Sequence, residues 1–326
     1  MSKKQKNEAS NASSSLFIES LNRARDEDIC PSTREWETSR KRRVYRELTR
    51  VIIFVLCAAL FISSLYRIVR TLIDYKQAED FYTEMYDMLD NMNLGSEILI
   101  DIPLNRLPSF GTINSPKGEG AASYNKVFTR MKSKILAIKS INSDMYGWIV
   151  VPGTDNIDLP VLQTTDNEYY LNHVYTGGYL QAGSVFADYR CSRDTNANFN
   201  TVIYAHNMQN GMMFSELIKF LDEEFFRENE YIYLCTETGI YTYRIFSVFK
   251  TDYRSGYVET GFPSANDFVK FANDMQEKSM FKREGISFNT DSRIITLSTC
   301  TNSTWSDRYC IQGILVDSYN SQEAYN

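Results

Sequence analysis

The feature that most constrains this 326-residue chain is one uncharged, strongly apolar run at residues 51–66, VIIFVLCAALFISSLY. As an α-helix with a rise of about 1.5 Å per residue, this run extends about 24 Å. A bilayer hydrocarbon core is about 30 Å thick, and Ile68 and Val69 lengthen the run if Arg67 reaches back to the interface. We therefore expect one transmembrane helix over residues 51–69. A buried core helix of a soluble protein is the alternative.

Basic residues are distributed unequally around this run. Cytoplasmic flanks of membrane helices carry an excess of Lys and Arg, and this excess sets the orientation of the chain. We therefore expect a single-pass protein of the cell membrane, with its N-terminus in the cytoplasm and the region after residue 69 outside the cell. The basic residues before the run are Arg34, Arg40, Lys41, Arg42, Arg43, Arg46 and Arg50, and those after it are Arg67, Arg70 and Lys76.

The region after the apolar run is acidic. Residues 67–326 contain 23 Lys and Arg against 33 Asp and Glu, and the whole chain has a net charge of -6. An acidic body opposes binding to nucleic-acid phosphates, so we expect no nucleic-acid partner.

The composition divides the chain into four parts. Residues 1–50 are rich in Ser, Asn and charged residues, which predicts a largely disordered cytoplasmic tail before the membrane helix. Apolar residues recur every three or four positions over 78–92, which predicts an amphipathic helix that forms a stalk or packs on the main domain. Proline and glycine interrupt 95–120, so we interpret 70–123 as a stalk helix and linker. Residues 124–326 then form the extracellular domain.

Short β-rich runs separated by turn residues dominate the chain after residue 144. Together with a few helices, they predict a mainly β domain with flanking helices, built as a closed or nearly closed eight-stranded barrel. We expect the interspersed helices at 214–228 and 264–278. The eight runs are 147–151, 159–163, 184–188, 200–205, 231–235, 240–250, 293–298 and 309–316.

The chain has two histidines, and their positions differ. His206 directly follows the β-run TVIYA and precedes a polar turn, so we expect its side chain at the rim of the barrel. His173 enters a Gly-Gly loop after a short helical segment, and we interpret it as a surface or hydrogen-bonded structural residue.

Cys300 has the context of a reactive thiol. It ends the run RIITLSTC before a polar loop, so its sulfur should lie at a strand end. Thiolate chemistry needs a proton acceptor or a nearby positive charge, which His206 and Arg308 could supply. The chain has no CxxC, HExxH or phosphate-cradling loop, and we expect neither a metal nor a cofactor. The other extracellular cysteines, which could be buried thiols or disulfide partners, are Cys191, Cys235 and Cys310.

These motifs resemble those of the sortases, specifically class B. The segment VIYAHNMQNGMMF carries the family's histidine at His206, and ITLSTC matches the element that ends in the nucleophile, Cys300. Arg308 completes the family's Cys–Arg pair, and Ala205 stands where the family more usually has Gly. The resemblance covers about residues 124–317. Further similarity lies in GWIVVPGT (147–154), LPVLQTTDNEYYL (159–171) and AGSVFADYR (182–190).

The resemblance implies a sortase-type barrel and a membrane-anchored cysteine transpeptidase on a Gram-positive surface. Cys300 would attack the threonine carbonyl of a C-terminal sorting signal and form a thioacyl enzyme. His206 would transfer protons, and Arg308 would stabilise the substrate carbonyl as it becomes negative. The residues that family position places in the substrate groove are Asn167, Leu171, Tyr204, Tyr257, Val258, Ser298 and Thr301.

The implied partners are sorting-signal peptides of the NPxTN, PPxTG or LPxTG type and an acceptor amine. The amine would belong to a peptidoglycan precursor or to a pilin lysine. Two alternatives remain open on the sequence: a cysteine endopeptidase that passes the acyl group to water, and a surface-binding module without catalytic activity.

Overall fold

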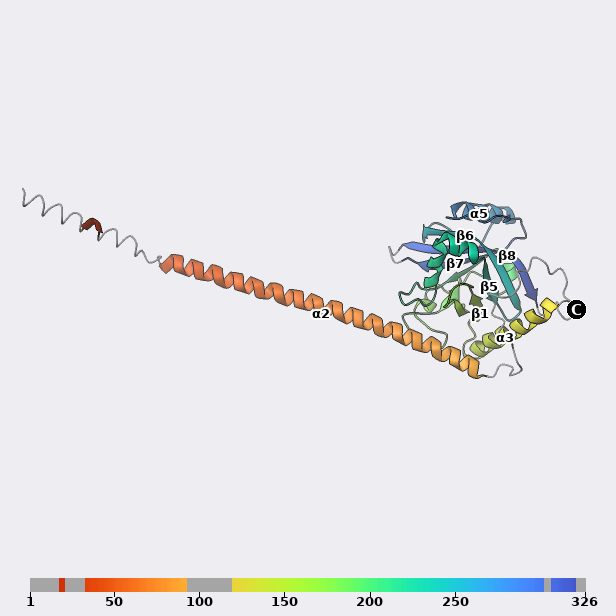
Figure 1. Cartoon of the computed structure of the whole chain (residues 1–326), viewed down its shortest axis with the longest axis horizontal. Helices are drawn as coiled ribbons and strands as arrows, with labels where there is room; N and C mark the ends of the chain where they lie inside the picture. Colours follow the sequence, from red (N-terminus) through yellow and green to blue (C-terminus); the bar gives the residue numbers. More distant parts are fainter. Residues whose placement is uncertain (1–17, 21–32, 93–118, 302–305, 321–326) are drawn as a thin grey trace, which may run out of the picture. The chain divides into compact units, whose positions relative to one another are not determined.

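The structure is a computed structural model that describes residues 18–20, 33–92, 119–301 and 306–320 (Figure 1). The chain divides into two compact units, Met1–Arg70 and Thr71–Asn326, which we describe separately. Most of the linker that the sequence predicts at 95–120 lies outside the described residues.

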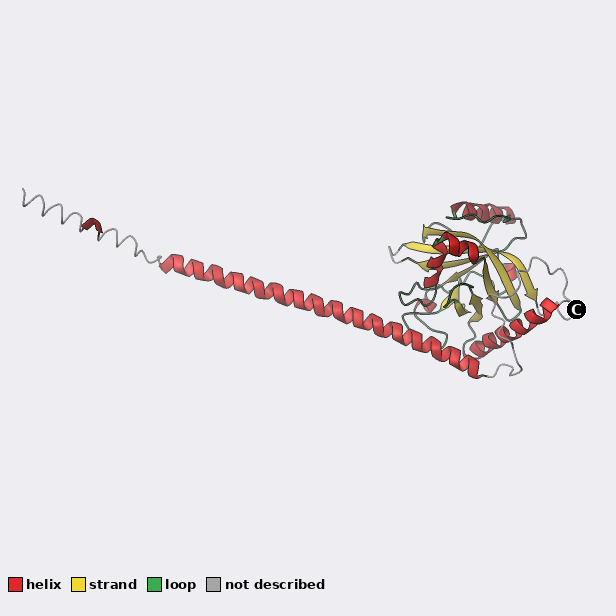
Figure 2. Cartoon of the chain, viewed as in Figure 1, coloured by secondary structure: helices red, strands yellow, loops and turns green. Residues whose placement is uncertain are grey.

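Helix α2, Thr33–Asn91, is the longest element (Figure 2). Among the described residues, one helix is long and apolar enough to cross a membrane, at Trp36–Asn91, and none of its most apolar window is buried. The predicted membrane helix at 51–69 is part of it. Residues 33–50 are helical, which differs from the predicted largely disordered tail over 1–50. This segment contains neither Pro nor Gly and is continuous with a long helix, so it adds turns without a new nucleation step.

The last part of α2 belongs to the second unit and packs on the barrel domain. Tyr82, Met85 and Leu89 recur at three- and four-residue spacing, and each is at most 3% exposed. The Tyr82 hydroxyl also donates a hydrogen bond to the Gly183 carbonyl at 2.8 Å. Of the two roles that the sequence allowed for residues 78–92, the structure therefore shows packing on the domain.

Helix α3, Glu119–Ile141, packs against strands β1 and β5 of the barrel. Phe128, Met131, Ile135 and Ile138 form its buried face. This face follows the helical period, so one side of the helix packs on the barrel and the other faces solvent.

Eight strands close into one barrel, which confirms the predicted eight-stranded barrel, and their order around it is β1-β2-β3-β4-β7-β8-β6-β5. All neighbouring pairs are antiparallel except β2–β3 and β4–β7, which are parallel. The strands are β1 Met145–Val150, β2 Asp158–Leu162, β3 Val185–Ala187, β4 Asn200–Tyr204, β5 Tyr231–Cys235, β6 Gly239–Asp252, β7 Ile294–Cys300 and β8 Asp307–Asn320.

The helices between strands are short except for α5, Ala265–Lys278, which packs on β6 and begins at the Ser264 cap. The helix predicted at 214–228 is interrupted. Asp222 has an extended ψ of 132° and its side chain caps a new helix by accepting a hydrogen bond from the Phe225 amide, so the segment divides into two pieces. These pieces are η4 Ser215–Leu221 and α4 Glu223–Glu228, and the other short helices are η2 Tyr169–Leu171 and η3 Thr195–Ala197.

Candidate active site

The parallel pairing of β4 with β7 brings His206 beside Cys300. Tyr204 on β4 is paired with Ser298 on β7, and His206 and Cys300 each lie two residues beyond that pair. Parallel strands end at the same edge of a sheet, so the two side chains emerge from the same rim. The rim position that the sequence predicts for His206 is therefore the one observed.

Two hydrogen bonds fix the backbone segments of this rim to each other. The Thr299 hydroxyl donates to the Ala205 carbonyl at 2.8 Å. The Asn207 amide donates to the Cys300 carbonyl at 3.0 Å. The residues on either side of His206 are thus tied to the end of β7. Asn207, whose amide makes one of these two bonds, was not among the residues selected from the sequence.

Arg308 lies directly opposite Cys300. The two residues are a register pair of the antiparallel strands β7 and β8, and both side chains are half-buried. Cβ atoms of such pairs lie about 4.5 to 5.5 Å apart on the same face of the sheet. The guanidinium of Arg308 donates to the Asp307 carbonyl at 3.0 Å and lies 5.6 Å from the Tyr253 ring centroid.

Asp307, the acidic residue that precedes Arg308, forms an ion pair with Lys250 through its carboxylate at 2.9 Å. The Asp307 carbonyl accepts a hydrogen bond from the Thr301 amide at 3.0 Å, which closes the base of the loop between β7 and β8. Thr301 is thus bonded to the residue that precedes Arg308.

A backbone carbonyl orients the imidazole of His206. Its Nε2 lies 2.7 Å from the Leu171 oxygen, and a carbonyl can only accept, so Nε2 carries a proton. Proton exchange with a thiol or an amine then falls to Nδ1 in this tautomer. The Leu171 side chain is 40% exposed, so this predicted groove residue combines an exposed apolar side chain with a backbone contact to His206.

His173 lies in a different environment. Its Nδ1 is 2.8 Å from the Tyr169 carbonyl, and its ring stacks on the Tyr169 ring with centroids 4.1 Å apart. These contacts are those expected of a hydrogen-bonded structural histidine.

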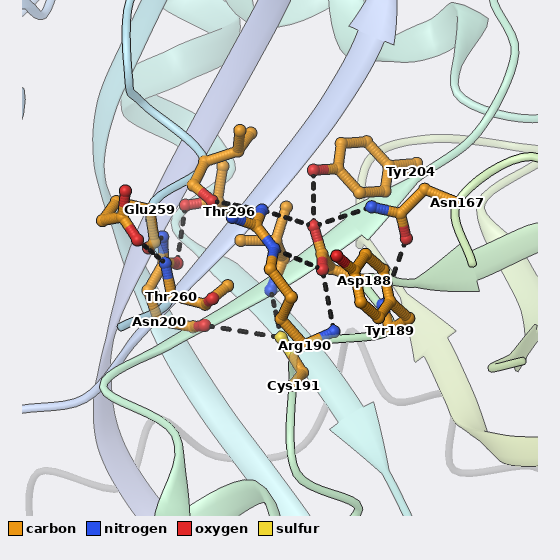
Figure 3. Close-up of polar contacts among 12 residues, drawn as sticks. Asn167, Asp188, Tyr189, Arg190, Cys191, Asn200, Tyr204, Glu259, Thr260 and Thr296 are labelled. Atoms are coloured by element: carbon orange, nitrogen blue, oxygen red, sulfur yellow. Dashed lines mark hydrogen bonds and ion pairs between the residues drawn. The ribbon is translucent and has the colours of Figure 1, made fainter. Parts of the chain in front are cut away.

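Two predicted groove residues converge on a carboxylate that the sequence analysis did not select. Figure 3 shows Asn167 and Tyr204 pointing toward Asp188, whose side chain is completely buried. The Asn167 amide and the Tyr204 hydroxyl donate to the same Asp188 oxygen at 3.0 and 2.9 Å.

Arg190 neutralises Asp188 and extends this cluster. Its Nε and Nη2 donate to the two carboxylate oxygens at 2.9 and 2.7 Å, and Nη2 also donates to the Val258 carbonyl at 3.0 Å. Burial by itself would raise the pKa of the Asp188 carboxyl, but hydrogen bonds from Arg190 and Tyr204 outweigh burial and hold the pKa below its usual value. The carboxylate is therefore ionised at neutral pH.

The seven predicted groove residues differ in accessibility. The Tyr257 hydroxyl and the Ser298 hydroxyl are 2.6 Å apart, and each residue is 2% exposed. Thr301 is 7% exposed. These three side chains are therefore buried. Asn167, Leu171, Tyr204 and Val258 are all at least partly exposed.

The remaining thiols of the second unit are buried and free of disulfides. Burial raises the pKa of the Cys191 thiol to about 11 and also raises the pKa of the Cys235 and Cys310 thiols. These three thiols therefore lose their protons less readily than an ordinary cysteine. Among the described cysteines of this unit, Cys300 is the one that is partly exposed.

Comparisons with known proteins agree with this geometry. A family model described as "Sortase domain" matches residues 149–316. "Sortase B" of Listeria monocytogenes is 36% identical over 199 residues, which cover 60% of this chain and 79% of that relative. The X-ray structure of Clostridium perfringens sortase B has a TM-score of 0.53 at 36% identity and covers 56% of this chain and 99% of that one. A Staphylococcus aureus sortase B–substrate complex has a TM-score of 0.53 at 28% identity, with coverage of 60% and 96%.

Proposed function

This chain belongs to the sortase family, class B, and from its relatives we infer that it is a sortase-type cysteine transpeptidase. From that premise we propose that it is anchored in the cytoplasmic membrane of a Gram-positive cell. There it would cleave a C-terminal sorting signal after threonine and join the surface protein to an amine. The acceptor would be a peptidoglycan precursor or a pilin lysine.

One observation supports this proposal above the others. Cys300 ends β7 with Arg308 directly opposite on β8, and His206 leaves the neighbouring parallel strand at the same rim. A nucleophile, a proton carrier and a fixed cation from three adjacent strands form the set that acyl transfer requires.

The first half of the reaction forms a thioester. Cys300 attacks the threonine carbonyl carbon as a thiolate, and its proton resides on His206. Arg308 donates hydrogen bonds to the carbonyl oxygen as that oxygen becomes negative. When the carbon–nitrogen bond breaks, His206 returns the proton to the leaving amine.

The second half regenerates the enzyme. The acceptor amine attacks the thioester carbonyl and loses a proton to His206, and the carbon–sulfur bond breaks to restore the thiolate. The exposed members of the groove, Asn167, Leu171, Tyr204 and Val258, would hold the peptide. A solved neighbour is a sortase B–substrate complex, which supports a peptide substrate of the sorting-signal kind.

The direct test incubates the detergent-solubilised full chain with NPxTN-, PPxTG- and LPxTG-type peptides, with and without a primary amine such as triglycine. We expect mass spectrometry to find a new amide product that contains the acceptor. A product formed only with water would indicate an endopeptidase, and peptide binding without cleavage would indicate a binding module.

Variants assign the roles in the same assay. We expect Cys300→Ala and His206→Ala each to lower turnover by at least about 100-fold, because nucleophile activation and proton transfer are lost. His173→Ala is the matched control and should retain most of the activity. Equal losses for the two histidine variants would contradict the assignment of His206.

A further inference from the structure

The two sides of the proposed groove are joined by one ion pair, between the buried carboxylate of Asp188 and the partly exposed guanidinium of Arg190. Asn167, from the loop before η2, and Tyr204, at the end of β4, donate to Asp188 on one side. On the other side Arg190 donates a hydrogen bond to the carbonyl of Val258, which lies in the segment after β6. Groove residues from three separate parts of the chain therefore share a single charged centre.

A second copy of the same tripeptide shows what is unusual about this pair. Asp252-Tyr253-Arg254 repeats the sequence Asp188-Tyr189-Arg190, and in both copies the arginine folds back onto its own aspartate with Nε at 2.9 Å. The Arg254 side chain is 70% exposed, and its aspartate is 36% exposed. The pairing of the arginine with its own aspartate is thus a local property of the sequence Asp-x-Arg, whereas complete burial and the hydrogen bonds from Asn167 and Tyr204 are particular to Asp188.

The hydrogen bonds at Asp188 also fix the polarity of the groove side chains. Both carboxylate oxygens are occupied: one accepts from the Arg190 amide and Nε, and the other from Arg190 Nη2, Asn167 and Tyr204. Because Tyr204 donates its proton to Asp188, its oxygen presents lone pairs to a ligand. Asn167 is held at both ends, since its Oδ1 accepts from the Tyr189 amide at 3.1 Å.

The segment that carries Val258 has an adjacent attachment to the barrel. The Glu259 carbonyl accepts from Asn200 at 2.9 Å, and Thr296 on β7 donates to the other end of the Asn200 amide at 2.8 Å. The carbonyls of Val258 and Glu259 therefore accept hydrogen bonds from the Arg190 and Asn200 side chains, respectively. Of these two donors, Arg190 is the one that also connects to the opposite side of the groove, through Asp188.

We propose that Asp188 and Arg190 are positioning residues for the sorting-signal peptide. They hold the Asn167 and Tyr204 side chains and the Val258 segment at the spacing that the bound peptide requires, and they set Tyr204 as an acceptor for a peptide N–H group. This inference rests on the proposed function. It assigns the pair a role in binding and none in proton transfer, because the carboxylate accepts its hydrogen bonds from Arg190 and from the groove residues Asn167 and Tyr204.

The test measures peptide cleavage by the full chain with the panel peptide that the wild type cleaves fastest. Asp188→Asn has nearly the same size but removes the charge and one acceptor oxygen, and Arg190→Gln removes the fork while Asp188 remains. We expect KM to rise at least tenfold in each variant, with kcat within about threefold of wild type. The rate at which iodoacetamide alkylates Cys300 should stay unchanged.

Glu230→Gln is the matched control. Glu230 is a partly buried carboxylate that pairs with Arg244 and Arg283 beside β5, on the opposite side of the barrel from β4. Its loss should lower the melting temperature without changing KM. If Asp188 acts through Tyr204, adding Tyr204→Phe to Asp188→Asn should raise KM by less than the product of the two single effects.

Several outcomes would overturn the inference. Wild-type KM in the folded variants, a loss confined to kcat, or KM effects that multiply in the double variant would each contradict it. If Asp188→Asn does not fold, Arg190→Gln decides the test, because Arg190 is 37% exposed and its replacement disturbs the interior less. Failure of the wild type to bind or cleave any panel peptide would instead contradict the proposed function on which the inference rests.

Discussion

The positive charge of Arg308 and the planar shape of its guanidinium make separate contributions to the proposed binding of the oxyanion. The guanidinium is a rigid planar fork of donors, whereas lysine offers one mobile ammonium group. The backbone bond to Asp307 and the position over the Tyr253 ring restrict the fork further. If the fork binds the developing oxyanion, Arg308→Ala should lower turnover by about 10²- to 10³-fold. Arg308→Lys should recover only a minor part of that loss, as measured by steady-state cleavage, with the fold intact by circular dichroism.

The alternative role of Arg308 is a surface ion pair, worth at most about 1 kcal/mol of stability. The Asp307 carboxylate is paired with Lys250, so Lys250→Gln is the control that disturbs this acidic residue without removing the fork. We expect Lys250→Gln to keep most of the turnover. Near wild-type turnover of Arg308→Ala would favour the ion-pair role, and full rescue by lysine would show that positive charge is sufficient.

Single residues were predictable from sequence where strand ends determine their positions. His206 and Cys300 each follow a β-rich run, and the structure places both at one rim. The role of Asp188 could not be predicted from the sequence in the same way. Its local pattern recurs at Asp252, and only the tertiary arrangement of Asn167 and Tyr204 makes one copy a buried centre.

The last turns of α2 are part of the folded domain. Tyr82, Met85 and Leu89 are buried against it, and each such side chain contributes about 1.5 to 3 kcal/mol. We therefore expect residues 71–326 to form a soluble, monomeric and active protein. Residues 93–326 should melt at least about 10 °C lower, since about 1 kcal/mol corresponds to 2 to 4 °C for a domain of this size. Thermal denaturation and light scattering measure both.

Point variants separate packing from chain length in this prediction. Leu89→Ala creates a cavity and should cost about 2 to 5 kcal/mol of stability. Glu84→Ala, on the exposed side of the same helix, should change stability by less than about 0.5 kcal/mol. Equal effects of the two variants would contradict the packing role of α2, and aggregation of 71–326 that only detergent relieves would show that the apolar run belongs to the fold.

The strands were easier to predict than the helix boundaries. All eight β-rich runs are strands, because runs of β-branched and aromatic residues between turn residues have few other stable conformations. Asp222 interrupts a segment whose apolar period continues through it, since its capping hydrogen bond competes with the helix. Residues 33–91 form one helix because neither Pro nor Gly lies between its charged first part, its apolar middle part and its amphipathic last part.

The distribution of charge along the chain favours one orientation in the membrane. The basic residues before residue 51 favour the cytoplasmic side, and the acidic region after residue 67 is the part that would be translocated. A peptide substrate and an acceptor amine at the cell surface require the Cys300 rim to be outside. The proposed function therefore requires the same orientation that the charges predict.

Labelling of single introduced cysteines in intact cells tests this orientation. Ser20 precedes the apolar run and Ser140 follows it, and both residues are exposed. In a chain that carries Cys30→Ser and Cys300→Ala, we expect a membrane-impermeant maleimide to label Ser140→Cys in intact protoplasts. Ser20→Cys should be labelled only after the membrane is permeabilised, because the charged N-terminal segment stays in the cytoplasm. The reverse pattern would contradict the orientation, and labelling of both sites in intact protoplasts would show that residues 51–69 do not span the bilayer.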